Sequence, residues 1–305
     1  EWKDKVESYL FALLKEIRAI GKMSEGHRPD SVYIGGGTPT TLEAEQMDRL
    51  LKTITENFDL SNVLEFTVEA GRPDSITEEK LAVIRKYPVT RISINPQTMQ
   101  QKTLDLVGRN HTVAQTKDAF YLARKLGFDN INMDLILGLP GELEADVQRT
   151  IEKIVELAPD SLTVHSLAIK RASRLNQWIQ ENGVSMLHNT DETMKIAAAG
   201  AEKLGMKPYY LYRQKNTLQN LENVGWCKPG HEGYYNIYIM EEVQTILSAG
   251  AGGSTKLVAD GGRRMQRIFN FKYPTEYIQR FAEVLERKKG VADFYDHDLG
   301  SETSG

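Results

Sequence analysis

Residues 31–40, SVYIGGGTPT, decide how the rest of the sequence is interpreted. A short run of strand-forming residues ends in three glycines, which let a ligand approach the backbone closely. Ligands of parallel α/β folds bind at this carboxyl end of the strands. No Gly-Lys-Ser/Thr follows, and the glycines are not spaced as in a dinucleotide fingerprint, so neither nucleotide-binding loop fits. A plain tight turn stays open as the alternative to a ligand loop.

Outward from this stretch, β-branched runs alternate with amphipathic segments of helix length, which is typical of βα units and a parallel sheet. The predicted strands cover residues 31–34, 64–69, 91–95, 130–137 and 161–166. The predicted helices cover residues 4–20, 42–57, 77–86, 113–126 and 143–157. Because a β/α barrel usually begins with a strand, we expect one more strand upstream of Glu1.

The pattern changes after residue 170. Helices are predicted over 190–204 and 275–288, and a stretch rich in Tyr and Gly, from 209 to 253, lies between them. We therefore predict an α/β protein with two domains. A partial (β/α)6-type barrel covers 1–170, and a smaller α+β module, which would cap the barrel and bind substrate, covers 171–305.

The composition is that of a globular protein. The chain has 305 residues, 40% of them hydrophobic, and its 38 Lys+Arg against 42 Asp+Glu give a net charge of −4. These values exclude a disordered or fibrous chain and argue against nonspecific nucleic-acid binding. Cys227 is the only cysteine, so no intrachain disulfide forms and a reducing, cytoplasmic location is predicted. No apolar run approaches the roughly 20 residues of a membrane span.

Polar residues lie at or near the ends of three of the predicted strands. Glu69 and Gln97 follow the second and third strands, and Asp134 lies in the fourth. One barrel would direct all three side chains into a shared cleft. The alternative for each residue is a capping or loop-fixing role.

The histidines give no metal signal. His111, His165 and His188 form no metal-like spacing with one another or with a cysteine, so no zinc site is predicted. His165 ends a strand and is a candidate for the pocket wall, with a satisfied core histidine as the alternative.

Several motifs together resemble the radical S-adenosylmethionine (SAM) enzymes. They are YIGGGTPT (33–40), FTVE (66–69), RISINPQ (91–97), Gly108-Arg109 and NMDLILGLP (132–140). The resemblance is to the oxygen-independent coproporphyrinogen III oxidase branch (HemN/HemZ-like), which also contains heme chaperones. The later stretches YRQKN (212–216), ENVG (222–225) and ILSAGAGG (246–253) are similar to the HemZ-type coproporphyrinogen dehydrogenases.

The resemblance implies a SAM site. The turn formed by Gly35, Gly36, Gly37 and Thr38 would hold the amino and carboxylate groups of SAM. Glu69, Gln97, Arg109 and Asp134 match the family's contacts to the methionine and ribose parts. Elementary chemistry agrees, because a guanidinium suits a carboxylate, and carboxylates accept from ammonium or ribose hydroxyl groups. A structural salt bridge stays open as the alternative for Arg109.

One departure from the family pattern concerns the cluster. The family needs a Cys-x3-Cys-x2-Cys loop that binds a 4Fe-4S cluster, and this chain contains no such loop. Cys227 alone cannot hold a cluster, so no metal ligand is predicted and the chain as it stands is expected to be inactive. Either the cluster loop lies upstream of Glu1, which the missing first strand favours, or the protein is a cluster-free relative.

The implied activity is oxidative decarboxylation of two propionates of coproporphyrinogen III, which gives protoporphyrinogen IX in heme biosynthesis. A SAM-derived radical would take a hydrogen atom from each propionate β-carbon. Loss of CO2 and removal of one further electron would then leave a vinyl group. An electron-donor protein is the implied partner. The substrate carboxylates would meet cationic residues at the cleft mouth. The candidates are Lys170, Arg171, Arg174, Arg213 and Lys215. A heme chaperone, or an enzyme acting on another tetrapyrrole, stays open as the alternative.

Overall fold

The chain divides into two compact units. The computed structural model describes residues 2–167, 174–183, 187–212 and 222–301. The sheet unit comprises residues 31–43 and 65–240, and the terminal unit comprises residues 1–30, 44–64 and 241–305. This division differs from the boundary at residue 170, because later strands join the first sheet and the chain's two ends share one unit. As a division of roles between cofactor and substrate, that boundary stays a prediction.

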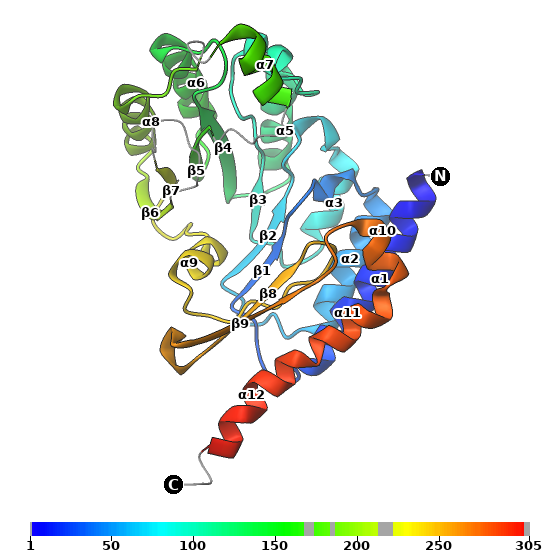
Figure 1. Ribbon diagram of the computed structural model, residues 1–305. Coiled ribbons are helices and arrows are strands. Elements are labelled where there is room, and N and C mark those ends of the chain that lie inside the picture. Colours follow the sequence, from blue (N-terminus) through cyan, green and yellow to red (C-terminus); the bar gives the residue numbers. More distant parts are fainter. Residues whose placement is uncertain (1, 168–173, 184–186, 213–221, 302–305) are drawn as a thin grey trace. The chain divides into compact units, whose positions relative to one another are not determined.

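The sheet unit is built on a seven-stranded mixed sheet. Its order is β1-β2-β3-β4-β5-β7-β6, with β1 to β5 parallel and β7 antiparallel to both of its neighbours (Figure 1). The strands are β1 (Ser31–Ile34), β2 (Glu65–Glu69), β3 (Arg91–Ser93), β4 (Ile131–Leu137), β5 (Ser161–Ser166), β6 (Lys207–Tyr212) and β7 (Asn223–Cys227). The predicted α/β class and the five parallel strands are therefore confirmed.

Helices connect the parallel strands as the sequence predicts. Between the parallel strands of this unit lie α3 (Glu78–Arg85), α4 (Gln101–Leu106), α5 (Val113–Lys125) and α6 (Glu144–Leu157). After β5 come α7 (Arg174–Asn182), α8 (Asp191–Lys203) and α9 (Tyr234–Glu241). Of these, α4, α7 and α9 were not predicted. Threonine caps fix two of the helix starts: Thr77 Oγ1 accepts from Lys80 N at 3.2 Å, and Thr112 forms a capping box with Gln115.

The strands β6 and β7 were not predicted. They enlarge the sheet at the β5 edge, where Val164 pairs with Val224 in antiparallel register. The Tyr210 ring covers Gly225 so closely that a Cβ there would lie 1.9 Å from the ring. Only glycine fits at this position, which explains a glycine inside a buried strand.

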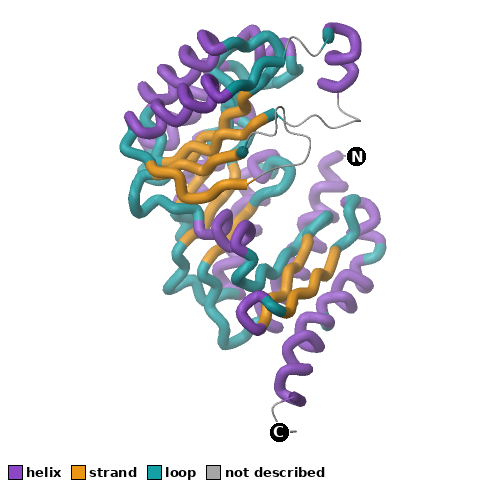
Figure 2. Tube along the Cα trace, turned by 60° about the vertical axis from the view of Figure 1, so that its left-hand side comes forward, coloured by secondary structure: helices purple, strands orange, loops and turns teal. Residues whose placement is uncertain are grey.

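The terminal unit joins the two ends of the chain. It contains α1 (Trp2–Met23), α2 (Ala44–Asn57), β8 (Ser254–Ala259), β9 (Arg264–Phe269), α10 (Pro274–Gln279), α11 (Phe281–Lys288) and α12 (Gly290–Ser301). Figure 2 shows β8 and β9 as a separate antiparallel pair. The predicted helix 275–288 is wrong as a single helix, because Arg280, with φ −110° and ψ 30°, interrupts it.

A buried ion pair lies at the centre of the terminal unit. Lys288 Nζ is 3.2 Å from Glu16 Oε1, and both side chains are at most 1% exposed. Glu16 also accepts from Asn270 Nδ2 at 2.7 Å, from Gly250 N at 2.8 Å and from the Tyr277 hydroxyl. Burial lowers the pKa of Lys288, although Glu16 opposes this shift. The pair therefore ties α1 to residues more than two hundred positions later.

None of the helices within the described residues combines the length and the apolar character that a membrane-spanning helix needs.

Replacing Lys288 with Met should destabilise the terminal unit, because it leaves the Glu16 carboxylate buried without its cation. We expect the free energy of unfolding to fall by about 3 kcal/mol or more in urea denaturation followed by circular dichroism. The control is Lys289→Met, which removes the neighbouring exposed lysine from its pair with Glu286 and should change stability by about 0.5 kcal/mol or less. Equal effects of the two variants would contradict a structural role for the buried pair.

Candidate functional site

One face of the sheet is polar. Register pairing places Tyr33 beside Thr67, Thr67 beside Arg91, and Asp134 beside Thr163. Because side chains alternate along a strand, paired residues share a face. We call this the polar face. Glu69 and Asp134, two of the predicted site residues, lie on it in β2 and β4.

Glu69 ends β2 and is held by a tyrosine. The Tyr33 hydroxyl donates a hydrogen bond to Glu69 Oε1, and the Tyr33 ring stacks on Tyr235 with centroids 4.2 Å apart. Burial raises the pKa of Glu69, and the nearby Asp134 raises it further, while the Tyr33 hydrogen bond lowers it; the net shift is upward. The carboxyl is thus oriented before any ligand arrives.

Asp134 lies between two side chains that hold its carboxylate. Asn132 Nδ2 donates to Asp134 Oδ1 at 2.7 Å, and His165 Nε2 lies 3.5 Å from Asp134 Oδ2. Burial raises the pKa of Asp134, but His165, Asn132 and Arg91 together outweigh this effect and the net shift is downward. Asp134 is therefore an ionised acceptor.

Gln97 adopts a backbone conformation that is uncommon for a non-glycine residue. Its φ is +67°, a strained value that often marks functional positions. Its backbone bridges to β4, because Gln97 N donates to Asp134 O at 3.0 Å and Ile136 N donates to Gln97 O at 2.9 Å. Gln97 therefore follows β3 in the sequence, and its backbone is hydrogen-bonded to β4 at Asp134 and Ile136.

The glycine loop after β1 is exposed but firmly anchored. Gly36 has φ +83°, and a Cβ on Gly35 would lie 2.6 Å from the Tyr33 ring and 3.0 Å from the Glu69 carboxyl. At the far end of the loop, buried Thr40 pairs with Ser75 at 2.6 Å through their hydroxyls. The loop therefore presents free backbone next to Glu69, which is what a ligand-binding turn requires.

Arg109 lies in a hollow of its own. Arg109, Arg72, Asn95 and His111 line a hollow of about 160 Å³ beyond the ends of β2 and β3. Burial lowers the pKa of Arg109, and the charge of Arg72 lowers it further. Arg109 has no ion-pair partner among the described residues, whereas Arg72 pairs with Asp74 at 2.5 Å. Among the described residues, no hydrogen bond or ion pair links Arg109 to Glu69 or Asp134. The structure therefore places Arg109 apart from these two carboxylates.

Three residues of this region were missed in the sequence. Arg72 directly follows the Glu69-Ala70-Gly71 strand end, a position that could have marked it. Tyr33 reaches Glu69 because of the register in which β1 pairs with β2, which the local sequence does not reveal. Arg91 is 2% exposed and lies 4.0 Å from Glu65, with its Nε lacking a hydrogen-bond partner; nothing in its local sequence shows this burial.

The predicted substrate cations are not tested here. Lys170, Arg171, Arg213 and Lys215 lie outside the described residues, and of Arg174 only its place as the first residue of α7 is described.

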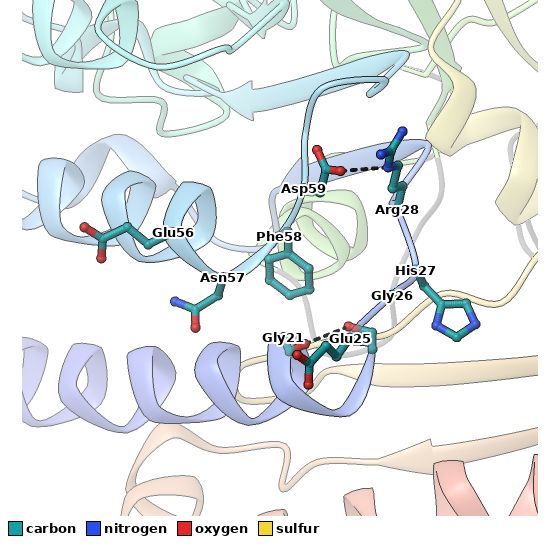
Figure 3. A pocket seen from close by; sticks show the side chains of 10 residues that line it. Gly21, Glu25, Gly26, His27, Arg28, Glu56, Asn57, Phe58 and Asp59 are labelled. Atoms are coloured by element: carbon teal, nitrogen blue, oxygen red, sulfur yellow. Dashed lines mark hydrogen bonds and ion pairs between the residues drawn. The ribbon is translucent and has the colours of Figure 1, made fainter.

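The described residues do not fit an iron-sulfur cluster. They contain no group of three or more His, Cys, Asp or Glu side chains that could hold a metal ion. Burial raises the pKa of the Cys227 thiol to about 12, which disfavours the thiolate that metals bind. A larger hollow of about 450 Å³ lies in the terminal unit at the C-terminal ends of α1 and α2, beside the Arg28–Asp59 ion pair (Figure 3). No predicted site residue lines it.

A mainly parallel βα sheet with oriented carboxylates on one face is the architecture of a partial β/α barrel, a class in which ligands bind at the carboxyl ends of the strands. Comparison narrows this class. Residues 9–154 match the model of the radical SAM superfamily. The structure superposes on the coproporphyrinogen III oxidase HemN of Escherichia coli with a TM-score of 0.70 and 23% identity, over 92% of this chain and 63% of that one.

Two relatives show which branch this is. The chain is 45% identical to the oxygen-independent coproporphyrinogen-III oxidase-like protein HemZ of Bacillus subtilis, over 93% of this chain and 57% of that protein. It is 32% identical to the heme chaperone HemW of Lactococcus lactis, over 94% of this chain and 72% of that protein. The chain therefore belongs to the radical SAM superfamily, in the HemN/HemW family with a HemZ-like sequence. It spans little more than half the length of the Bacillus protein.

The close approach of Gly35 to Tyr33 and Glu69 can be tested without a ligand. In Gly35→Ala the new methyl group must displace both side chains, so we expect the free energy of unfolding to fall by about 1 to 3 kcal/mol. Gly37→Ala is the matched control, because a Cβ there meets no atom within 4 Å. Urea denaturation of both variants checks this, and equal stabilities would show that the loop does not pack as described.

Proposed function

We propose that this chain is the SAM-binding part of a radical SAM enzyme that oxidatively decarboxylates coproporphyrinogen III. The observation that carries the proposal is the grouping of Glu69 at the end of β2, the Gln97 backbone after β3 and Asp134 within β4, beside the glycine loop. The 45% identity to a coproporphyrinogen-III oxidase-like protein supports the choice of substrate.

The residues present fit SAM by chemistry. The ionised Asp134 would accept from ribose hydroxyl groups, and Glu69 would accept from the ligand's ammonium group. Exposed backbone at Gly35 to Gly37 would contact the amino-acid part, and the unpaired Arg109 would meet its carboxylate. Bound SAM supplies a 5′-deoxyadenosyl radical when a reduced cluster is present. No cluster step is assigned to this chain, because its described residues do not fit one.

The remaining roles are proposals about the whole protein. The substrate's propionates would bind the predicted cations Lys170, Arg171, Arg174, Arg213 and Lys215. An electron donor would reduce the cluster of a longer form of the protein. A reducing, cytoplasmic location stays a prediction from the single cysteine.

Heme delivery is the second candidate, since relatives named heme chaperones match most of the chain. The polar face offers no distinction between the two functions, because SAM contacts are expected in both groups. A test of function must therefore measure turnover and heme binding side by side.

The test of function uses the full-length gene product under anaerobic conditions. With coproporphyrinogen III, SAM and a chemical reductant, we expect CO2 release and protoporphyrinogen IX. The variants Asp134→Asn and Glu69→Gln should lower kcat/KM by about ten-fold or more, since each loses a charged hydrogen bond. Tight 1:1 heme binding without turnover would contradict the proposal and support a chaperone. Turnover of a different tetrapyrrole alone would overturn the substrate assignment.

Ligand binding should depend on the ionisation of Glu69. An acid whose pKa is raised is ionised above that pKa, so affinity for an ammonium-bearing ligand should fall as the pH drops through it, above the ordinary carboxyl range. Calorimetric titration of this chain with S-adenosylhomocysteine as a function of pH measures this. In Glu69→Gln this inflection should vanish; an unchanged profile would separate Glu69 from the ligand.

A further inference from the structure

His165 occupies a position on the polar face that the SAM contacts leave unexplained. It is the second-last residue of β5 and pairs with Ile136, two register pairs beyond the Asp134–Thr163 pair and therefore on the same face. Its Nε2 lies 3.5 Å from Asp134 Oδ2, and its Nδ1 lies 3.1 Å from the Tyr212 hydroxyl. The imidazole therefore stands between a carboxylate from β4 and a phenol from β6.

Hydrogen-bond chemistry assigns a direction to this chain of groups. A neutral imidazole has one donor nitrogen and one acceptor nitrogen. When the Tyr212 hydroxyl donates to Nδ1, the proton of His165 lies on Nε2 and points to Asp134. Asn132 Nδ2 already donates to the other oxygen of Asp134. The two nitrogens, His165 Nε2 and Asn132 Nδ2, then each face a different oxygen of the Asp134 carboxylate.

A buried asparagine links the ends of the strands that carry His165 and Tyr212. Asn223, which is fully buried, accepts from Ser166 N at 2.7 Å and donates to Tyr212 O at 3.4 Å. Its side chain thus joins the end of β5 to the end of β6 across β7. These hydrogen bonds hold together the backbone ends of β5 and β6, the strands that carry His165 and Tyr212.

We propose that His165, held by Tyr212, is a positioning residue that orients the Asp134 carboxylate toward the ribose hydroxyl groups of an adenosine ligand. This inference rests on the proposed SAM site and names a residue that acts through Asp134 without touching the ligand. Second-layer partners of this kind commonly fix the geometry of a binding carboxylate.

The charges around Asp134 make the effect of His165 measurable. Groups on five strands act on Asp134 or feel its charge: Tyr33, Glu69, Arg91, His165, Tyr210 and Tyr212. Burial alone raises the pKa of Asp134, and His165 is the strongest influence in the opposite direction. Without the imidazole, the pKa of Asp134 should move upward while the other groups stay in place.

The experiment compares His165→Gln and Tyr212→Phe with the unaltered chain. Calorimetry with S-adenosylhomocysteine should show a loss of affinity of about ten-fold for His165→Gln and a smaller loss for Tyr212→Phe. For analogues that lack the 2′- or 3′-hydroxyl, His165→Gln should lower the affinity much less. These analogues cannot form the hydrogen bond to Asp134 that His165 supports. The matched control is His188→Gln. It removes a different His–carboxylate pair near the surface, in which His188 Nε2 lies 2.5 Å from Glu144 Oε1.

A second measurement needs no ligand. Carbon-13 NMR titration of the Asp134 carboxyl, assigned with Asp134→Asn, should show its pKa rising in His165→Gln and less so in Tyr212→Phe. If the unaltered chain does not bind S-adenosylhomocysteine, the proposed function fails, while the NMR titration still decides the coupling of His165 to Asp134. An unchanged carboxyl titration, or an equal loss of affinity for all analogues, would overturn the positioning role.

Discussion

The buried side chain of Asn132 is the interaction on which the polar face depends. Its amide donates to Ser93 Oγ at 3.0 Å and to Asp134 Oδ1 at 2.7 Å, and its oxygen accepts from Ser161 at 3.0 Å and Thr163 at 3.2 Å. All four hydrogen-bonding positions of the amide are filled. One side chain thus joins β3, β4 and β5 and aims a carboxylate. A polar interior is stable only when such a network is complete, because each unpaired buried group carries a desolvation cost.

The sequence predicts the parallel half of this sheet well and the antiparallel half poorly. Strands β1 to β5 follow from β-branched runs that alternate with amphipathic helices, and each lies within two residues of its expected bounds. Strand β7 carries Gly225, which reads as a break in a strand until the Tyr210 ring that covers it is known. The helix break at Arg280 likewise has no glycine or following proline to announce it. The local sequence pattern predicts local structure, whereas these features depend on residues that lie far away in the sequence.

The same reason limits prediction of the site. Glu69, Gln97 and Asp134 could be found because each is a polar residue that ends, follows or lies within an apolar strand, and parallel topology alone brings such strands side by side. The pairing of Tyr33 with Glu69, and of His165 with Tyr212, depends on register between strands that are separated in the chain. The ion pair of Glu16 with Lys288 is the extreme case, since it joins the first helix to α11. Nothing near either residue in the sequence distinguishes it from a solvated charge.

The described residues hold oriented carboxylates on the polar face but no group of side chains that could bind a metal ion. The carboxylates of the polar face are fixed by internal hydrogen bonds, so the face exists whether or not a cluster is bound. A thiol with a pKa near 12, as at Cys227, is a poor cluster ligand. Relatives named as oxidase-like and as chaperones both match across the polar face. The choice between their functions must therefore depend on residues that meet the tetrapyrrole. In the function that we propose, the network around Asn132 and His165 would hold an adenosine ligand in one orientation, a step that both candidate functions would share.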